Sequence, residues 1–357
     1  EKFNLCRFSY FCNYGLNVRE RQRAEINPMQ YGTIVHYILE RFFGEYTKEE
    51  YLSLEEDKFQ KIVCAYLAEY AVKYFGEEQL ESNSFTYRLK TILDNVMYLM
   101  KHIMEELSQS EFFVADCELK IGEDIPSYTI VLPDGHKIAV CGSVDRVDIM
   151  QRADITYLRI IDYKTGTKQF KLSDILYGIN LQMLLYLHSI EASGGDKYGE
   201  IVPAGILYMP ATVPYISSDS LKSIDKLPDE LNKKLKMNGL LLKDTEIIHG
   251  MDKTDAATYI PVKIKAGEPV SSTSLATLAE FGKIFKKVDM LIAEMGKNIY
   301  NGNIEAKPLK GGHDSCEYCP YDSVCAYRQS NPITCFSVDN KTVIEEITNE
   351  INGKEEE

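Results

Sequence analysis

Two runs of sequence decide the fold of this chain: Gly142-Ser-Val-Asp-Arg-Val-Asp148 and, after a polar break, Leu158-Arg-Ile-Ile-Asp-Tyr-Lys-Thr-Gly166. Both are rich in β-branched and apolar residues, and the second ends in turn residues, which predicts two strands joined by a short turn. Side chains alternate along a strand, so Asp162 and Lys164 share one face. An antiparallel hairpin would bring Asp145 to the same place.

Two carboxylates beside a lysine can carry out metal-dependent chemistry. Carboxylate oxygens bind hard cations such as Mg²⁺, and a neighbouring lysine orients a metal-bound water and stabilises charge on a phosphate. The alternative is that these residues are solvated charges at strand ends. Asp162-Tyr-Lys164 alone favours that alternative, whereas Asp145 on the neighbouring strand favours a site.

Composition narrows the class of protein. The chain has 357 residues, 45% of them hydrophobic, which is enough for a substantial core, and its net charge is −14. This charge argues against a generally basic DNA-coating protein but leaves room for a local basic groove. The sequence shows no membrane-spanning run, no signal peptide and no Walker A motif, so we expect a cytoplasmic protein without ATPase activity of its own. Because it lacks an initiator Met, we expect a piece of a longer chain.

Two predicted helices carry polar residues that could serve the same site. Residues 28–46 begin with Pro, end near Gly and show apolar spacing, which predicts a helix that carries His36. Taken alone, such a histidine is more often packed in a core. The helix after the second strand carries Gln182 and Tyr186, which lie four residues apart and point the same way.

The remaining segments are interpreted as scaffold. Residues 112–121 predict a strand beside the motif strands, where Glu118 could approach the site, although a salt bridge or an edge position is the favoured interpretation. Weak periodicity and a high content of Ser, Lys and Gly in residues 213–260 predict a surface insertion. The expected organisation is a single domain at 1–335, with a helical insertion at about 48–110 and the surface insertion at about 213–260, followed by a C-terminal tail at 336–357.

The cysteines give a second strong signal. Residues 316–325 contain three of them in a C-x₂-C-x₅-C pattern, and thiols at this spacing in a chain without an export signal usually bind a metal. Three ligands are one short of a closed site. Cys335 is near in sequence, and Cys6 or Cys12 could complete the site from the other end of the chain. Zinc and an iron–sulfur cluster both accept four thiolates, so spacing leaves the metal open.

The motif residues resemble the PD-(D/E)XK nuclease superfamily. Val144-Asp145 and Asp162-Tyr-Lys164 match the two halves of its motif, with Val in place of Pro, and the surrounding Gly-x-x-Asp-Arg-x-Asp and Asp-Tyr-Lys-Thr-Gly are similar to its RecB-type branch. The resemblance implies an α/β (mixed α+β) fold, with a restriction-endonuclease-like core sheet flanked by helices. It also implies Mg²⁺ or Mn²⁺ bound by His36, Asp145, Asp162 and the Tyr163 carbonyl, and catalysis by Asp145, Asp162, Lys164, Gln182 and Tyr186.

A second resemblance concerns the cysteines. An early Cys within Phe3-x-x-Cys6-x-Phe8, together with the late C-x₂-C-x₅-C, is similar to the iron–sulfur staple of AddB- and Cas4-like nucleases. In those proteins a [4Fe–4S] cluster joins the two ends of the nuclease domain. This resemblance implies Cys6, and not Cys12, as the fourth ligand, with zinc as the alternative metal. The implied cluster ligands are Cys6, Cys316, Cys319 and Cys325.

Together the resemblances imply a Mg²⁺-dependent exonuclease that acts on single-stranded DNA during the processing of double-strand-break ends. Phrases around Tyr10 and Cys319 are most similar to the AddB family, which implies the nuclease domain of a longer helicase–nuclease subunit with an AddA-like partner. Arg146, Lys168 and Lys171 are expected to meet DNA phosphates. The alternatives are a catalytically silent iron–sulfur DNA-binding module, a Cas4-like nuclease, and a zinc-stapled interaction domain.

Overall fold

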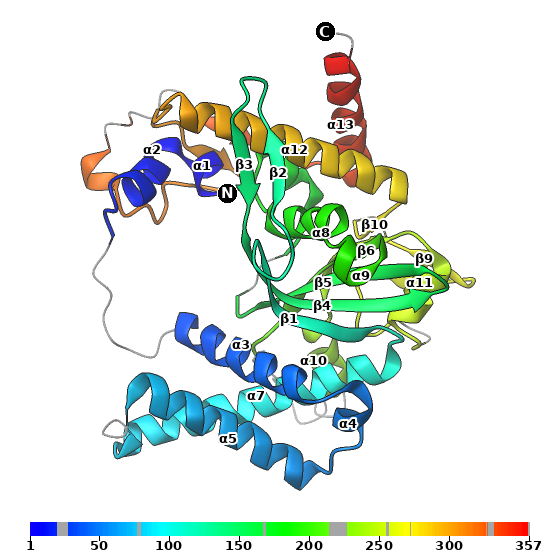
Figure 1. Cartoon of the computed structure of the whole chain (residues 1–357). Coiled ribbons are helices and arrows are strands. Elements are labelled where there is room, and N and C mark those ends of the chain that lie inside the picture. Colours follow the sequence, from blue (N-terminus) through cyan, green and yellow to red (C-terminus); the bar gives the residue numbers. More distant parts are fainter. Residues whose placement is uncertain are drawn as a thin grey trace.

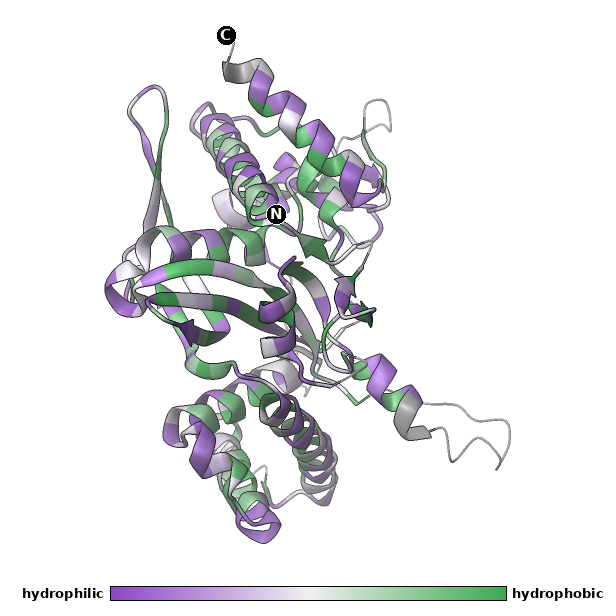
Figure 2. Cartoon of the chain, turned by 90° about the vertical axis from the view of Figure 1, so that its right-hand side faces the viewer, coloured by the Kyte–Doolittle hydropathy of each residue, from purple (hydrophilic) through white to green (hydrophobic). Residues whose placement is uncertain are grey.

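A central sheet lies between two layers of helices (Figure 1). Apolar residues follow the strands of this sheet, and the surrounding helices alternate hydrophilic and hydrophobic residues (Figure 2). The mixed α/β fold expected from the sequence is therefore confirmed. The computed structural model describes residues 1–19, 28–76, 80–166, 169–213, 227–254, 257–271, 273–325, 327 and 332–355.

Six strands form the central sheet in the order β1-β4-β5-β6-β7-β10. β1, β4 and β5 are antiparallel neighbours, β6 is parallel to β5, β7 is antiparallel to β6, and β10 is parallel to β7. The predicted motif hairpin is present as β4 and β5, and the strand expected beside it is β1. The strands are β1 (Phe113–Ile121), β4 (Gly142–Arg152), β5 (Ile155–Lys164), β6 (Glu200–Pro210), β7 (Asn238–Leu242) and β10 (Leu275–Ala276).

Helix α3 (Pro28–Glu45) crosses one face of the sheet and connects it to the helical insertion. Its apolar residues recur at helical spacing, so they form one stripe that is removed from water, while the opposite stripe stays accessible. Each member of the buried stripe is at most 1% exposed: Ile34, Val35, Ile38, Leu39 and Phe42.

The other helices form two groups. The predicted helical insertion is present and packs with α3 below the sheet in Figure 1; it contains α4 (Lys48–Leu52), α5 (Glu56–Phe75) and α7 (Asn83–Gln109). The opposite face is covered by α8 (Gln182–Ser193); α12 (Leu278–Tyr300) packs on α8, and α13 (Asn340–Glu355) packs on α12. Thr277 starts α12 with a capping box, in which its hydroxyl accepts from the Glu280 amide and the Glu280 carboxylate accepts from the Thr277 amide.

Smaller elements surround this core. The hairpin of β2 (Tyr128–Val131) and β3 (Lys137–Val140) leans over α8 and α12, where the Tyr128 hydroxyl donates to Asp289 at 2.9 Å. The others are α1 (Lys2–Leu5), α2 (Arg7–Tyr10), the π-helix η1 (Phe11–Gly15), the 3₁₀-helices η2 (Leu172–Tyr177) and η4 (Asp322–Val324), α9 (Gly195–Tyr198), α10 (Leu227–Leu235), α11 (Thr245–Met251), β8 (Lys263–Lys265), β9 (Glu268–Val270), β11 (Leu309–Gly311) and β12 (Ile333–Cys335).

The expected surface insertion at 213–260 is wrong for its second half. β7 is an interior strand of the sheet, and Leu240 and Leu241 are fully buried. A strand covered on both faces is apolar throughout, so it shows no alternation that sequence inspection could detect. Residues 214–226 lie outside the described part of the chain.

The expected C-terminal tail at 336–357 is also wrong, because most of it is the helix α13. Val343 and Ile347 lie one turn apart and are fully buried, and the helix packs against α12 and η2. Its mixture of charged residues with a narrow apolar stripe resembles a solvated tail when read as composition alone. Residues 356–357 lie outside the described part of the chain.

The N-terminal helices contact the segment that carries the late cysteines. The Tyr321 hydroxyl donates to the carbonyl of Val18 at 2.8 Å and to Asn13 at 3.2 Å. Asn4 in turn donates to the carbonyl of Gly178 at 2.8 Å. The first and last parts of residues 1–327 therefore meet in space, as the two-ended cysteine pattern requires. Among the described helices, none combines the length and apolarity needed to cross a membrane.

Candidate active site

The register of the sheet brings three carboxylates side by side. Arg146 lies opposite Ile161 on β5 and opposite Cys117 on β1. One position further, Asp145 therefore stands between Asp162 and Glu118, which occupy the neighbouring strands. The sequence predicted that Asp145 and Asp162 meet, and it left the approach of Glu118 to the site as the less favoured alternative to a salt bridge or an edge position.

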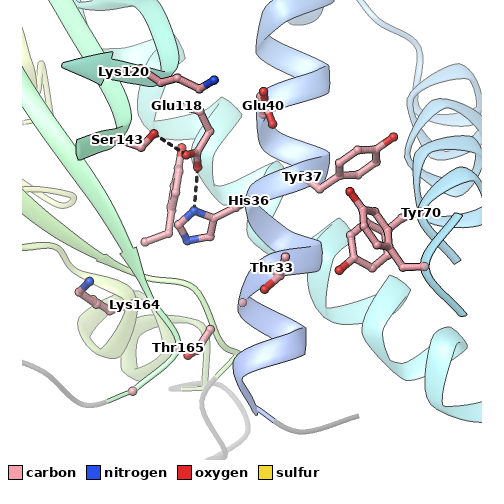
Figure 3. A pocket seen from close by; sticks show the side chains of 14 residues that line it. Thr33, His36, Tyr37, Glu40, Tyr70, Glu118, Lys120, Ser143, Lys164 and Thr165 are labelled. Atoms are coloured by element: carbon pink, nitrogen blue, oxygen red, sulfur yellow. Dashed lines mark hydrogen bonds and ion pairs between the residues drawn. The ribbon is translucent and has the colours of Figure 1, made fainter. Parts of the chain in front are cut away.

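His36 on α3 adds an imidazole to this group from the face of the sheet that α3 covers. Its Nδ1 lies 3.0 Å from Glu118 Oε1, and its Nε2 lies 3.6 Å from Asp145 Oδ2. One ligand atom from each of the three residues lies within 4.8 Å of the other two, so they could share a metal ion. Ser143 donates to the second oxygen of Glu118 at 2.8 Å and fixes that side chain (Figure 3). The salt bridge expected of Glu118 thus exists, and its partner is the predicted metal ligand.

Glu118 has a left-handed backbone conformation within β1, with φ at 49°. Non-glycine residues adopt this region rarely, and it costs about 1–3 kcal/mol unless the surroundings enforce it. Here the carboxylate is held by both His36 and Ser143. The unusual backbone therefore coincides with the residue that links the sheet to the α3 histidine.

The pKa values of Asp145, His36 and Glu118 are shifted because several carboxylates lie close together. Burial raises the pKa of Asp145 to about 7, and the charge of Asp162 adds to the rise. Burial lowers the pKa of His36, but the hydrogen bond to Glu118 and the charge of Asp145 outweigh it, so that pKa is raised overall. The hydrogen bond with His36 also lowers the pKa of Glu118. A divalent cation would relieve this repulsion and keep the carboxylates ionised.

Asp162 and Lys164 share one face of β5, as alternation predicted, and they form an ion pair. Asp162 is 4% exposed, while the Lys164 side chain reaches the groove. The backbone between them also serves the site, because the Tyr163 amide donates to Asp145 Oδ2 at 2.9 Å. Binding of a metal by the Tyr163 carbonyl stays a prediction.

The helix α8 begins at Gln182 and places Tyr186 one turn later. Burial raises the pKa of Tyr186, a hydrogen bond with Gln182 opposes this, and the charges of Asp145 and Asp162 reinforce it. Tyr186 therefore faces the carboxylates. A Cβ added at Gly142 would lie 2.3 Å from the Tyr186 hydroxyl, so glycine at this point of the motif leaves room for that ring.

The expected contact of Arg146 with DNA is wrong. Arg146 is fully buried, donates to Asp148 at 2.7 and 2.6 Å, and donates to Glu106 of α7 at 3.0 Å. Alternation points it away from Asp145, toward the face covered by the helical insertion. Arg159 on β5 completes the same network through Asp148 and Glu106. The motif arginine thus anchors α7 to the sheet.

The other two basic residues expected to meet DNA have different outcomes. Lys168 lies outside the described residues. Lys171 is exposed at the start of η2, so its contact with phosphates stays a prediction.

An open groove of about 760 Å³ runs past the carboxylates. The accessible stripe of α3 forms its floor, with His36 directed toward the sheet and Tyr37 toward α5 (Figure 3). One wall carries Glu118 and Lys164 from the sheet, and the other carries Tyr70 from α5. The groove therefore connects the possible metal position to an aromatic surface.

Thiols from both ends of the chain come together at a second place. Burial raises the pKa of Cys12, and the neighbouring thiols of Cys325, Cys319 and Cys6 raise it further. Cys319 also interacts with Cys316. This donor set suits a cluster or a zinc ion bound by thiolates, and it contains both Cys6 and Cys12.

Cys335 belongs to a different environment. It is buried in a small cluster with Ile179 and Leu309. Burial and the charge of Asp174 raise the pKa of its thiol. Cys335 therefore packs with Leu5, next to Cys6, but it is not among the thiols that raise the pKa of Cys12.

Comparison with known proteins agrees with this geometry. The family model described as the PD-(D/E)XK nuclease superfamily matches residues 1–326. A protein of Thermoanaerobacter sp. (strain X514) is 34% identical over 339 residues, covering 92% of this chain and 29% of its own length. A protein of Clostridium kluyveri (strain NBRC 12016) is 34% identical over 374 residues, which cover 100% of this chain and 32% of the length of that protein. Both relatives carry the name of an ATP-dependent helicase/deoxyribonuclease subunit.

The chain spans about a third of the length of these curated relatives. The family match nevertheless includes each motif that the sequence indicated, from Cys6 through His36 and the β4–β5 hairpin to Cys325. Together, the match and the arrangement of carboxylates, histidine and lysine show that the chain belongs to the PD-(D/E)XK nuclease superfamily.

Proposed function

We propose that this chain is a Mg²⁺-dependent deoxyribonuclease domain that hydrolyses phosphodiester bonds of single-stranded DNA within a helicase–nuclease subunit. The observation that carries the proposal is the convergence of His36, Asp145, Asp162 and Lys164 at one end of an open groove. The names of the relatives support a DNA substrate and work within a larger assembly, with an AddA-like partner subunit.

A divalent ion held by His36, Asp145, Asp162 and the Tyr163 carbonyl would supply a Lewis acid that stabilises charge on the phosphate. Lys164 is held at its position by the ion pair with Asp162, from where it orients the attacking water. The oxygen of the attacking water forms a new bond to phosphorus while the P–O bond to the leaving sugar oxygen breaks. The water gives up one proton and the leaving oxygen takes up one, so the products are a phosphomonoester and a free hydroxyl. Tyr186, held by Gln182, is placed to hydrogen-bond the strand beside the reacting phosphate.

Glu118 supports the histidine in this scheme. A carboxylate that accepts from His36 Nδ1 leaves the Nε2 lone pair directed toward Asp145, where the metal would bind. Such a partner fixes both the tautomer and the ring orientation of a metal-binding histidine. Replacing Glu118 with Gln would therefore weaken Mg²⁺ binding by about 10- to 100-fold, which isothermal titration can measure.

The thiols complete the proposal. Cys6, Cys316, Cys319 and Cys325 would hold a [4Fe–4S] cluster that ties the N-terminal helices to the end of the domain. The contacts of Tyr321 with residues 13 and 18 bring the two segments into register without it. Such a cluster would have a structural role, since none of its four thiols is among the residues that line the groove.

The decisive experiment is cleavage of end-labelled single-stranded and duplex DNA in the presence of Mg²⁺. Asp162→Asn and Lys164→Met should each lower the rate by at least about 100-fold. Asp134→Asn, on the exposed β2–β3 turn, is the matched control and should cleave like the wild type. Cleavage at the wild-type rate by both active-site variants would reject the site. A folded, metal-loaded wild type that binds DNA without cutting it would favour the silent binding module.

A further inference from the structure

The groove wall opposite the carboxylates is a ladder of three tyrosines: Tyr37 on α3, and Tyr70 and Tyr74 on α5. Ring centroids are 5.2 Å apart for Tyr37 and Tyr70, and 4.4 Å apart for Tyr70 and Tyr74. All three line the same cavity as His36 and Lys164, and Figure 3 shows Tyr37 and Tyr70 on the side of α3 opposite to His36. The ladder therefore lies across the α3 floor from the possible metal position.

We propose that this tyrosine ladder is a stacking platform for the unpaired bases of the DNA strand that enters the candidate active site. The inference rests on the proposed function and adds the place where the substrate is held. A single strand presents its phosphates along one edge and its bases along the other. With phosphates directed to Lys164 and the carboxylates, the bases point across the α3 floor toward the ladder.

The exposed fractions of the tyrosine side chains show that core packing accounts for only part of the ladder. Tyr70 is 5% exposed and belongs to the hydrophobic core, so packing explains its ring. Tyr74 is 56% exposed, and its ring gains little from burial in the free protein. The Tyr74 ring is tilted by 35° against the buried Tyr70 ring and presents an exposed π-surface, on which bases of any sequence can stack.

Polar contacts hold the ladder and add positive charge beside it. The Tyr37 hydroxyl donates to Glu69 of α5 at 2.7 Å, and Arg41 donates to the same carboxylate at 3.2 Å. These bonds fix the Tyr37 ring between the two helices. Lys73 lies 5.2 Å from the centre of the Tyr74 ring, where a cation can meet a backbone phosphate.

The chemistry favours a single strand over a duplex. Stacking requires a base face that is free, and paired bases inside a duplex are covered by their neighbours. The sheet wall supplies Lys120 and Lys164 as the cationic groups of the groove, while Glu40 on the floor disfavours close approach of a second phosphate chain. The ladder and the lysines therefore fit one chain of nucleotides between them.

The test measures binding of a short fluorescent oligo(dT) by anisotropy, in an Asp162→Asn background so that no cleavage occurs. Tyr74→Ala should weaken binding by roughly 5- to 150-fold, the range expected for loss of one base–aromatic stack. Tyr74→Trp should bind the oligonucleotide as tightly as the parent protein does, because it keeps an aromatic ring at this position. Tyr300→Ala is the matched control, since Tyr300 is also 56% exposed but lies on α12, and it should bind normally.

Two further measurements identify the contact as stacking. An abasic strand of the same length should bind the Tyr74 protein and the Tyr74→Ala protein equally, because it has no bases to stack. Binding of oligo(dT) by Tyr74→Ala within about twofold of the parent would overturn the inference. Weak binding by Tyr74→Trp would also overturn it, because an indole ring stacks on bases as a phenol ring does.

The outcomes also separate this inference from the proposed function. Cleavage by the wild type, with binding unaffected by Tyr74→Ala, would reject the ladder and leave the nuclease intact. Base-dependent binding through Tyr74 in a wild type that does not cleave would support the ladder and reject the nuclease.

Discussion

Replacing His188 with Gln should remove a pH-dependent part of the stability of this domain. His188 lies on α8, the helix that carries Gln182 and Tyr186, and its ring is stacked on Phe285 of α12 at 4.7 Å. Its Nε2 lies 3.3 Å from Asp289, and its Nδ1 lies 3.3 Å from Glu191. These contacts connect α8 to the helix that covers it.

The size of the effect follows from the ionisation of this histidine. Burial opposes its charge, but the hydrogen bonds with Asp289 and Glu191 outweigh burial and raise the pKa of His188 to about 9. A rise from 6.5 to about 9 corresponds to about 3 kcal/mol of stability from the protonated form. Because the folded-state pKa is raised, this stability is fully present below about pH 6.5 and is lost as the pH rises through about 9.

The assay is urea unfolding of the metal-free wild type and of His188→Gln, each at about pH 6 and about pH 9.5. Between these two pH values the free energy of unfolding should fall by about 3 kcal/mol more in the wild type than in the variant, because the other groups titrate alike in both proteins. Equal pH dependence in the two proteins would refute the reasoning. It would mean that His188 gains nothing from Asp289 and Glu191 in the folded state.

Three further changes test other parts of the structure. Gly142→Ala should lower the cleavage rate, since the new methyl would lie 2.3 Å from the Tyr186 hydroxyl and displace that ring. Arg146→Met should lower the free energy of unfolding in urea by about 3–5 kcal/mol, because it leaves the buried carboxylates of Asp148 and Glu106 with Arg159 as their one remaining partner in this network. Cys319→Ser should lose bound iron, measured by metal analysis, and should lower the melting temperature.

Controls for these changes lie elsewhere in the chain. Gly282→Ala adds a methyl in open space within α12 and should leave cleavage unchanged. Cys64→Ser, in α5, should keep the iron. Loss of cleavage in Gly282→Ala, or retention of iron in Cys319→Ser with full stability, would contradict the corresponding assignment.

Strand alternation was sufficient to predict the reactive face of the motif hairpin. The placement of Asp162 and Lys164 follows from a spacing of two residues, and the β4–β5 register then adds Asp145. The same rule, applied to Arg146 and Asp148, places both on the opposite face. Alternation alone therefore indicated that Arg146 points away from Asp145, and the expected DNA contact was inconsistent with it.

Glu118 and β7 required information that local sequence does not contain. The position of Glu118 beside Asp145 depends on the register of β1 against β4, which residues 113–121 do not specify by themselves. β7 is a short apolar strand whose place in the sheet depends on β6 and β10. The meeting of Cys12 with Cys319 likewise depends on the whole fold between them.

The α3 helix has a consequence for how this domain can evolve. His36 and Tyr37 are adjacent in sequence, yet one side chain faces the sheet carboxylates and the other faces α5. A rotation or slide of α3 therefore changes metal coordination and the aromatic wall in the same movement. If the proposed function holds, substitutions in the buried stripe of this helix alter DNA binding and bond cleavage together. Variation that tunes only one of them must leave the position of α3 unchanged, as a substitution of Tyr37 itself can.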